Sequence, residues 1–209
     1  MTAPLYETLS TFWAARSIPV AIPAAYRHMH SPTMTIRNRL FASDAFTKIH
    51  VEHAATSSGL DILHSVAFPR HTRDAPILGM DLVCFKGAPT MGICDVSGGG
   101  QEGLLRPPKG GAPGRTMPDW GRGLFSKQCV FVDRPDLEDF AAFLERAART
   151  YAAAVESLPP APEHRRRYRK NFKTIYGNTQ CQNPRTFAVL AAAFGPDLAA
   201  RYMEEVMFG

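Results

Sequence analysis

The chain has 209 residues, of which 45% are hydrophobic and 21% charged. This composition excludes a disordered chain and supplies a core that needs no disulfide or metal, so we expect residues 1–209 to form a single domain. No apolar run approaches the roughly 18 residues of a membrane-spanning helix. The first residues, MTAPLYETLSTFW, lack the basic-then-apolar pattern of a signal peptide. We therefore expect a cytoplasmic protein without a membrane partner.

The formal net charge is +5, and much of the excess lies in the run EHRRRYRKNFK at 163–173. A basic run is typical of nucleic-acid binding, of a solvated helix face, or of a surface that attracts an acidic protein. The chain has no RRM, KH or zinc-finger signature. We therefore expect no nucleic-acid partner, and the other two interpretations stay open.

In chain order, a short helix is predicted over residues 5–13 and is followed by strands rich in Val, Ile, Leu or Phe. The predicted strands are 33–41, 45–53, 60–68, 77–85, 91–96 and, after a Gly/Pro-rich loop at 97–115, 125–132. The intervals between the first five strands are too short for crossover helices, so sequential antiparallel pairing is expected.

The C-terminal third of the chain is predicted to be helical. Apolar residues recur at helical spacing over 136–158, and prolines end this helix. Further helices are predicted over 163–176, 185–194 and 197–207. Strands that come first and helices that come last predict helices packed on an antiparallel sheet, in an α+β arrangement or an α/β fold with three layers.

Three apolar strands each carry one titratable residue where a hydrophobic side chain would be expected. These residues are Glu52, His64 and Asp81, and strand alternation places His50 on the same face as Glu52. A partly exposed sheet face or a satisfied core histidine would account for any one of them. Together, on neighbouring strands, they favour a proton-handling site in which an acid orients an imidazole.

Other chemistries fit the sequence poorly. Four widely spaced cysteines form no CxxC pair, and the two histidines of HVEH at 50–53 would point to opposite faces of a strand, so no metal is expected. The glycine run at 98–100 lacks the GK[ST] ending of a phosphate loop, no helix pattern follows it at once, and there is no GxSxG motif. These absences argue against a nucleotide-dependent enzyme or a serine hydrolase.

The ordered segments GLDILHSVAFP, DAPILGMDLVCF, GICDVS, MPDWG, QNPRTFAVLAAAFG and RYMEEVMF resemble those of the ferredoxin-dependent bilin reductases, most closely the phycocyanobilin-forming branch. The resemblance runs from about residue 46 to residue 208, interrupted by the loop at 97–115. It implies a three-layer α/β/α sandwich with a central antiparallel sheet, and a monomer. It also implies reduction of biliverdin IXα by electrons from ferredoxin, with no bound metal or flavin.

The resemblance further implies roles for individual residues. Asp81 matches the aspartate that protonates the bilin, His64 its histidine partner, and Glu52 the glutamate tied to reduction of the D-ring vinyl group. The positions expected to bind the substrate are His50, Thr90, Arg115, Gln180, Asn183, Arg185 and Val189. Thr90 and Arg115 fall near one propionate, and Arg185 replaces a family lysine that could hold the other.

One position departs from the family pattern. Some relatives use a second aspartate for the A-ring, and Pro184 stands there in this chain. Phycocyanobilin, which requires a four-electron reduction, is the expected product. Phycoerythrobilin, a dihydrobiliverdin, or a bilin-binding carrier without turnover are the alternatives.

Overall fold

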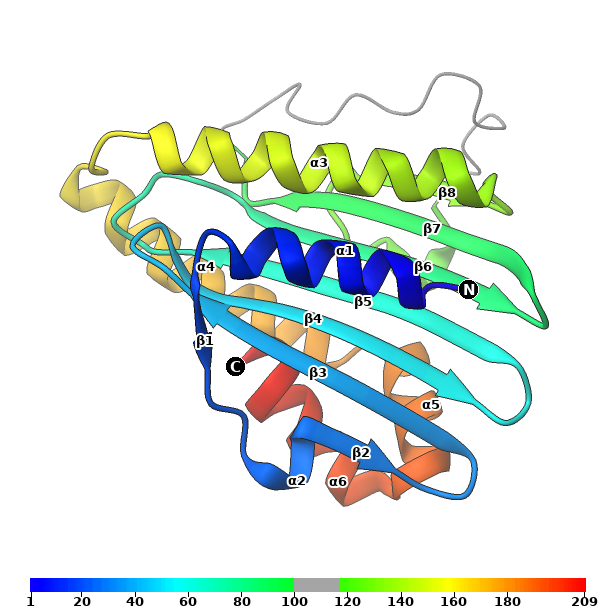
Figure 1. The fold of residues 1–209 in the computed structure, drawn as a ribbon. Helices are drawn as coiled ribbons and strands as arrows, with labels where there is room; N and C mark the ends of the chain where they lie inside the picture. Colours follow the sequence, from blue (N-terminus) through cyan, green and yellow to red (C-terminus); the bar gives the residue numbers. More distant parts are fainter. Residues whose placement is uncertain (100–116) are drawn as a thin grey trace.

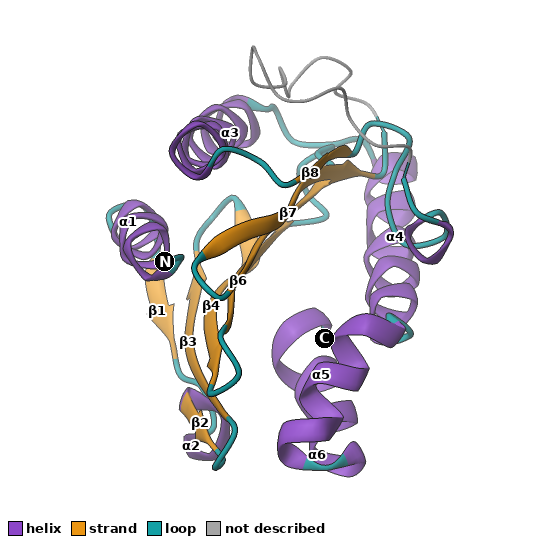
Figure 2. Cartoon of the chain, turned by 90° about the vertical axis from the view of Figure 1, so that its right-hand side faces the viewer, coloured by secondary structure: helices purple, strands orange, loops and turns teal. Residues whose placement is uncertain are grey.

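A computed structural model describes residues 1–99 and 117–209, in which helices lie on both faces of a curved antiparallel sheet (Figures 1 and 2). The N-terminal elements are α1 (Ala3–Ala14), β1 (Ile18–Val20), α2 (Ala24–Arg27), β2 (His28–His30), β3 (Met34–Ala42), β4 (Phe46–Thr56), β5 (Leu60–Pro69), β6 (Ile77–Phe85) and β7 (Ala88–Ser97). The C-terminal elements are the 3-10 turn η1 (Asp119–Gly121), β8 (Val130–Asp133), α3 (Leu137–Ser157), α4 (Glu163–Cys181), α5 (Pro184–Phe194), α6 (Pro196–Tyr202) and the π-helical η2 (Met203–Phe208).

The described strands form one sheet in the order β1-β3-β4-β5-β6-β7-β8, with β2 also paired to β3. Every pairing is antiparallel, and β3 to β7 follow one another as hairpins. The tightest hairpin joins β6 to β7 through Lys86 and Gly87, which both have positive φ, at 48° and 82°. Positive φ at both central residues is the conformation that matches the twist of antiparallel strands in a two-residue loop. The short connections account for the predicted sequential pairing.

Each face of the sheet carries its own apolar core. On one face α1 and α3 pack through fully buried residues that include Trp13, Phe140 and Tyr151. On the other, α5, α6 and η2 pack through residues that include Tyr202 and Phe208. Figure 2 shows α1 and α3 on one side of the sheet and α4 to α6 on the other. The predicted three-layer α/β/α sandwich is confirmed.

The structure differs from the predicted elements in several places, and α4 runs to Cys181, beyond its predicted end at residue 176. The strand expected over 125–132 begins only at Val130, because Ser126 donates two hydrogen bonds to the buried Asp95 carboxylate and holds 125–129 in turns. The last predicted helix changes to π-helix at Met203. Two three-residue strands and one turn of helix near the N-terminus, between residues 18 and 30, were not predicted because they are too short to show a periodic pattern.

Gly92 on β7 lies against Phe140 of α3. A Cβ atom at this position would lie 2.4 Å from Cε1 of Phe140, whose side chain is fully buried. We expect Gly92→Ala to lower the free energy of unfolding by about 1–3 kcal/mol, because the ring can move only by disturbing a packed core. Urea unfolding measures the loss. Gly123→Ala, which would meet no atom within 4 Å, is the control, and equal midpoints for the two variants would contradict the prediction.

Candidate functional site

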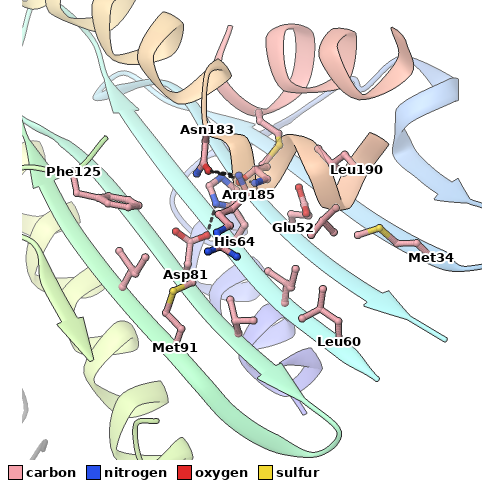
Figure 3. Close-up of a pocket in the computed structure, with 16 residues that line it drawn as sticks. Met34, Glu52, Leu60, His64, Asp81, Met91, Phe125, Asn183, Arg185 and Leu190 are labelled. Carbon is pink, nitrogen blue, oxygen red and sulfur yellow. Dashed lines mark hydrogen bonds and ion pairs between the residues drawn. The ribbon is translucent and has the colours of Figure 1, made fainter. Parts of the chain in front are cut away.

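The three titratable residues singled out in the sequence form one line across the sheet. The register places Glu52 on β4 opposite His64 on β5, and His64 opposite Asp81 on β6. Residues directly opposite each other on antiparallel strands have Cβ atoms about 5 Å apart and share a face. Three ionisable side chains therefore lie side by side on the face that α5, α6 and η2 cover (Figure 3).

A pocket opens above this line, between the sheet and α5. Its polar lining consists of Glu52, His64, Asp81, Asn183, Arg185 and Thr186. The rest of its lining is apolar and comes from β3 and β5 to β7, from α5 and η2, and from Phe125. In Figure 3 the polar side chains lie at the centre, with Leu60, Met91 and Phe125 around them. Such a pocket suits a large apolar ligand that carries a few polar groups.

His64 and Asp81 form a partly buried ion pair. The Nδ1 atom of His64 lies 2.8 Å from Oδ1 of Asp81. Burial by itself would lower the pKa of His64, but the charge of Asp81 and the hydrogen bond outweigh it, so this pKa lies above its ordinary value. The edge of the imidazole packs against Phe208 at 5.7 Å between centroids, which fixes the ring further. The pair thus favours the imidazolium form of His64, a proton donor, under the pocket.

Glu52 is the second proton-bearing group. Its side chain is buried, and burial raises the pKa of the carboxyl above its ordinary value, which favours the neutral acid near neutrality. Its Oε2 atom lies 2.6 Å from the hydroxyl of Tyr202 on α6. That hydroxyl also lies 2.6 Å from Oδ1 of Asn38 on β3. Glu52 is therefore hydrogen-bonded to α6, and the same hydroxyl of Tyr202 links it to the neighbouring strand β3.

His50 supports this arrangement from beneath the pocket. It is fully buried, and its Nε2 lies 2.8 Å from Oδ1 of Asn38. Burial, followed by the positive charges of His64 and Lys48, lowers its pKa well below the ordinary value, so the ring is neutral. His50 does not line the pocket. The structure thus places it behind Glu52, in a supporting position.

The other predicted substrate-binding residues divide into two groups. Asn183, Arg185 and Val189 line the pocket, and Asn183 also caps α5 by accepting hydrogen bonds from the backbone N–H groups of residues 185 and 186. Gln180 is buried outside the pocket lining, where it donates to the Leu124 carbonyl. Thr90 lies at a bulge of β7 and donates to the Val83 carbonyl. Both are outside the pocket lining.

Arg115 lies outside the described residues. Pro184, where some family members carry an aspartate, occupies the first turn of α5 and leaves no carboxylate there.

Sequence reasoning missed two residues that contact the proton-bearing groups. Asn38 is a buried polar residue of β3 and lies directly opposite Glu52. Its place between Ile36 and Leu40 on one face of the strand TMTIRNRLF is the same kind of signal that identified His64. Tyr202 carries no such signal, because an aromatic residue in a C-terminal helix is ordinary core material. Only the fold brings it to Glu52, which is 150 residues away in the chain.

Two further features bear on other functions. Among residues 1–99 and 117–209, no three histidine, cysteine or acidic side chains gather in a way that could hold a metal ion. No helix in the same part of the chain combines the length and apolar character needed to cross a bilayer.

Comparisons with known proteins give a consistent result. The model of the family described as ferredoxin-dependent bilin reductase matches residues 7–102 and 108–209. The phycocyanobilin:ferredoxin oxidoreductase of a Synechococcus species is 34% identical over 199 residues, covering 84% of this chain and 76% of that protein. The enzyme of the same name from Gloeobacter violaceus is 32% identical over 209 residues, covering 91% and 80%.

The fold has a counterpart among solved structures. Tomato phytochromobilin synthase in complex with biliverdin superposes with a TM-score of 0.72 at 16% identity, covering 97% of this chain and 82% of that one. At this identity the likeness concerns the fold alone.

The ion pair predicts how His64 responds to loss of its partner. We expect Asp81→Asn to lower the pKa of His64 from above its ordinary value to below it, because burial then acts with less opposition. NMR titration of the imidazole resonances measures the change. Asp61→Asn, which removes the partner of His53 instead, is the control and leaves His64 unchanged. Identical His64 titrations in the wild type and Asp81→Asn would show that the pair does not set the charge.

Proposed function

This chain belongs to the ferredoxin-dependent bilin reductase family, and we propose that it reduces biliverdin IXα to phycocyanobilin with electrons from reduced ferredoxin. The observation that carries the proposal is the line of Glu52, His64 and Asp81 beneath an apolar pocket. The line offers two proton-bearing groups of different kinds, a charged imidazolium and a neutral carboxylic acid. This suits a reaction in which each pair of electrons is matched by two protons.

The apolar lining of the pocket means that Glu52, His64 and Asp81 have to supply the protons. Water is scarce in such a pocket, so protons are delivered by groups that the protein fixes in place. His64 and Asp81 lie side by side near the middle of the pocket and would protonate the bilin after each electron arrives. Glu52 stands on the next strand, and we assign it to reduction of the D-ring vinyl group. Arg185, on α5, is proposed to face a propionate, since a guanidinium binds a carboxylate with two parallel hydrogen bonds.

An anaerobic assay with biliverdin and chemically or enzymatically reduced ferredoxin tests this function. Chromatography of the products separates the alternatives. Phycocyanobilin supports the proposal in full. Phycoerythrobilin or a dihydrobiliverdin would show that the chain is a bilin reductase but that the proposed product is wrong. A shifted biliverdin spectrum without any product would instead identify a bilin-binding carrier.

The role of Glu52 predicts a selective defect. We expect Glu52→Gln to slow D-ring vinyl reduction by about 10²-fold or more while A-ring reduction continues, because the amide keeps the shape of the acid but carries no transferable proton. A two-electron product should then accumulate and be seen by chromatography. Glu138→Gln, at an exposed position on the first turn of α3, is the control. An unchanged product mixture in Glu52→Gln would make Glu52 structural.

We also propose that the exposed side of α4 receives the acidic electron donor. The helix lies on the same side of the sheet as the pocket and exposes two basic residues, Arg167 and Lys170, beside the apolar residues Tyr168 and Ile175. Two other arginines of α4, Arg165 and Arg169, are instead bound to Asp74. Arg167 and Lys170 stay exposed, and Arg167 also pairs with Glu163 at 3.2 Å. These charges border an apolar patch, a combination that attracts a protein partner by charge and binds it by apolar contact.

Charge reversal tests this surface. We expect the double variant Arg167→Glu/Lys170→Glu to raise the KM for ferredoxin roughly tenfold at low salt and less at high salt, because salt screens exposed charges. Biliverdin affinity should not change. Arg146→Glu, on the exposed side of α3 and thus on the opposite face of the sheet, is the matched control. Equal KM values for both variants would place the donor elsewhere.

A further inference from the structure

The hydroxyl of Tyr202 is held between two oxygen atoms. It lies 2.6 Å from Oε2 of Glu52 and 2.6 Å from Oδ1 of Asn38, and its side chain is fully buried. A phenolic hydroxyl has one hydrogen and can donate to only one of them. The second short contact therefore needs a hydrogen that comes from Glu52 or from Asn38.

Asn38 cannot supply that hydrogen. Its amide nitrogen donates to the carbonyl of Tyr26 at 2.7 Å, which fixes Oδ1 as the atom that faces Tyr202. The same Oδ1 atom receives the Nε2–H of neutral His50 at 2.8 Å. Asn38 Oδ1 is thus an acceptor for both neighbours, and the remaining hydrogen belongs to Glu52. In the resting protein Glu52 donates to Tyr202, and Tyr202 donates to Asn38.

We propose that Tyr202 is a positioning residue that serves Glu52 in both protonation states: its hydroxyl accepts a hydrogen bond from the neutral acid and donates one to the carboxylate left after proton transfer. The inference rests on the proposed function, in which Glu52 protonates the bilin. In that step the O–H bond of Glu52 breaks and a C–H bond forms on the substrate, with electrons supplied by the reduced iron–sulfur protein. The Tyr202 O–H then turns from Asn38 to Glu52, and the 2.6 Å contact between its oxygen and Oδ1 of Asn38 lengthens because no hydrogen is left in it.

This exchange addresses the cost of leaving a charge in an apolar site. A buried carboxylate without a hydrogen-bond donor is strongly disfavoured, so an acid in that position holds its proton too tightly to be useful. The positive charge of His64 on β5 favours the ionised form of Glu52, and Asp81 on β6 opposes it. In the described part of the chain, Tyr202 is the side chain that hydrogen-bonds Glu52 directly. Asn38 keeps its bond from His50 when the Tyr202 hydrogen leaves.

The test compares Tyr202→Phe with Tyr26→Phe. Tyr26 packs 5.9 Å from Tyr202 in the same cluster, but its hydroxyl interacts with Glu205, so this variant removes a neighbouring hydroxyl without touching Glu52. The readout is the infrared C=O band of a protonated carboxylic acid, followed against pH in the ligand-free protein and assigned by its loss in Glu52→Gln. We expect the band in Tyr202→Phe to persist to a pH about one unit higher than in the wild type, and Tyr26→Phe to match the wild type.

A second variant shifts the band in the opposite direction. Asn38→Leu removes the acceptor that competes for the Tyr202 hydrogen, so the hydroxyl donates to Glu52 throughout and the band should disappear at a lower pH than in the wild type. In turnover, Tyr202→Phe should slow D-ring reduction roughly tenfold and leave A-ring reduction and biliverdin affinity unchanged.

The outcomes separate the two proposals. A Glu52 band that titrates alike in the wild type, Tyr202→Phe and Asn38→Leu, or a wild type with no such band at neutral pH, would overturn the role of Tyr202. Because the titration uses no substrate, it stands or falls independently of the assay for bilin reduction. The Glu52 band could shift in opposite directions in the two variants while the protein fails to reduce biliverdin. That result would support the hydrogen-bond exchange at Tyr202 and contradict only the proposed reaction.

Discussion

Three ionisable side chains withdrawn from water impose the constraint on which the rest of this structure depends. An unpaired buried charge costs several kcal/mol, so each group needs a partner or must lose its charge. His64 has the carboxylate of Asp81, Glu52 has the hydroxyl of Tyr202, and His50 stays neutral against Asn38. Because these partners come from several strands and from α6, the site forms only when the sheet and the C-terminal helices are both in place.

The register of the antiparallel sheet keeps these three side chains on one face and next to one another. Side chains alternate between faces along a strand, so a slip of one residue between β4 and β5 would turn Glu52 towards α1 and α3. Short hairpin loops prevent such slips, as at Lys86 and Gly87 between β6 and β7. The apolar core on the α3 side supports the same register, since Val51, Leu63 and Leu82 pack there.

The His64–Asp81 pair and Glu52 lie in different environments, which favour different protonation states. The carboxylate of Asp81 raises the pKa of His64 and so holds a charged imidazolium, whereas burial raises the pKa of Glu52 and favours a neutral acid. Titratable groups whose surroundings set different protonation states are characteristic of proton-transfer sites. The apolar pocket lies above these groups, and the basic α4 lies on the same side of the sheet.

The sequence by itself determined the alternation of the strands, the apolar stripe of α3 and the three-layer order, because these depend on local periodicity. It also identified Glu52, His64 and Asp81, because a titratable residue is unusual in an apolar strand. Only the tertiary structure decided what depends on contacts between distant segments. These are the register that aligns the three residues, the Tyr202–Asn38 pair 164 residues apart in the chain, the turn at Ser126, and the positions of Thr90 and Gln180 outside the pocket lining. No local pattern encodes such contacts, because packing and hydrogen bonding between elements select them.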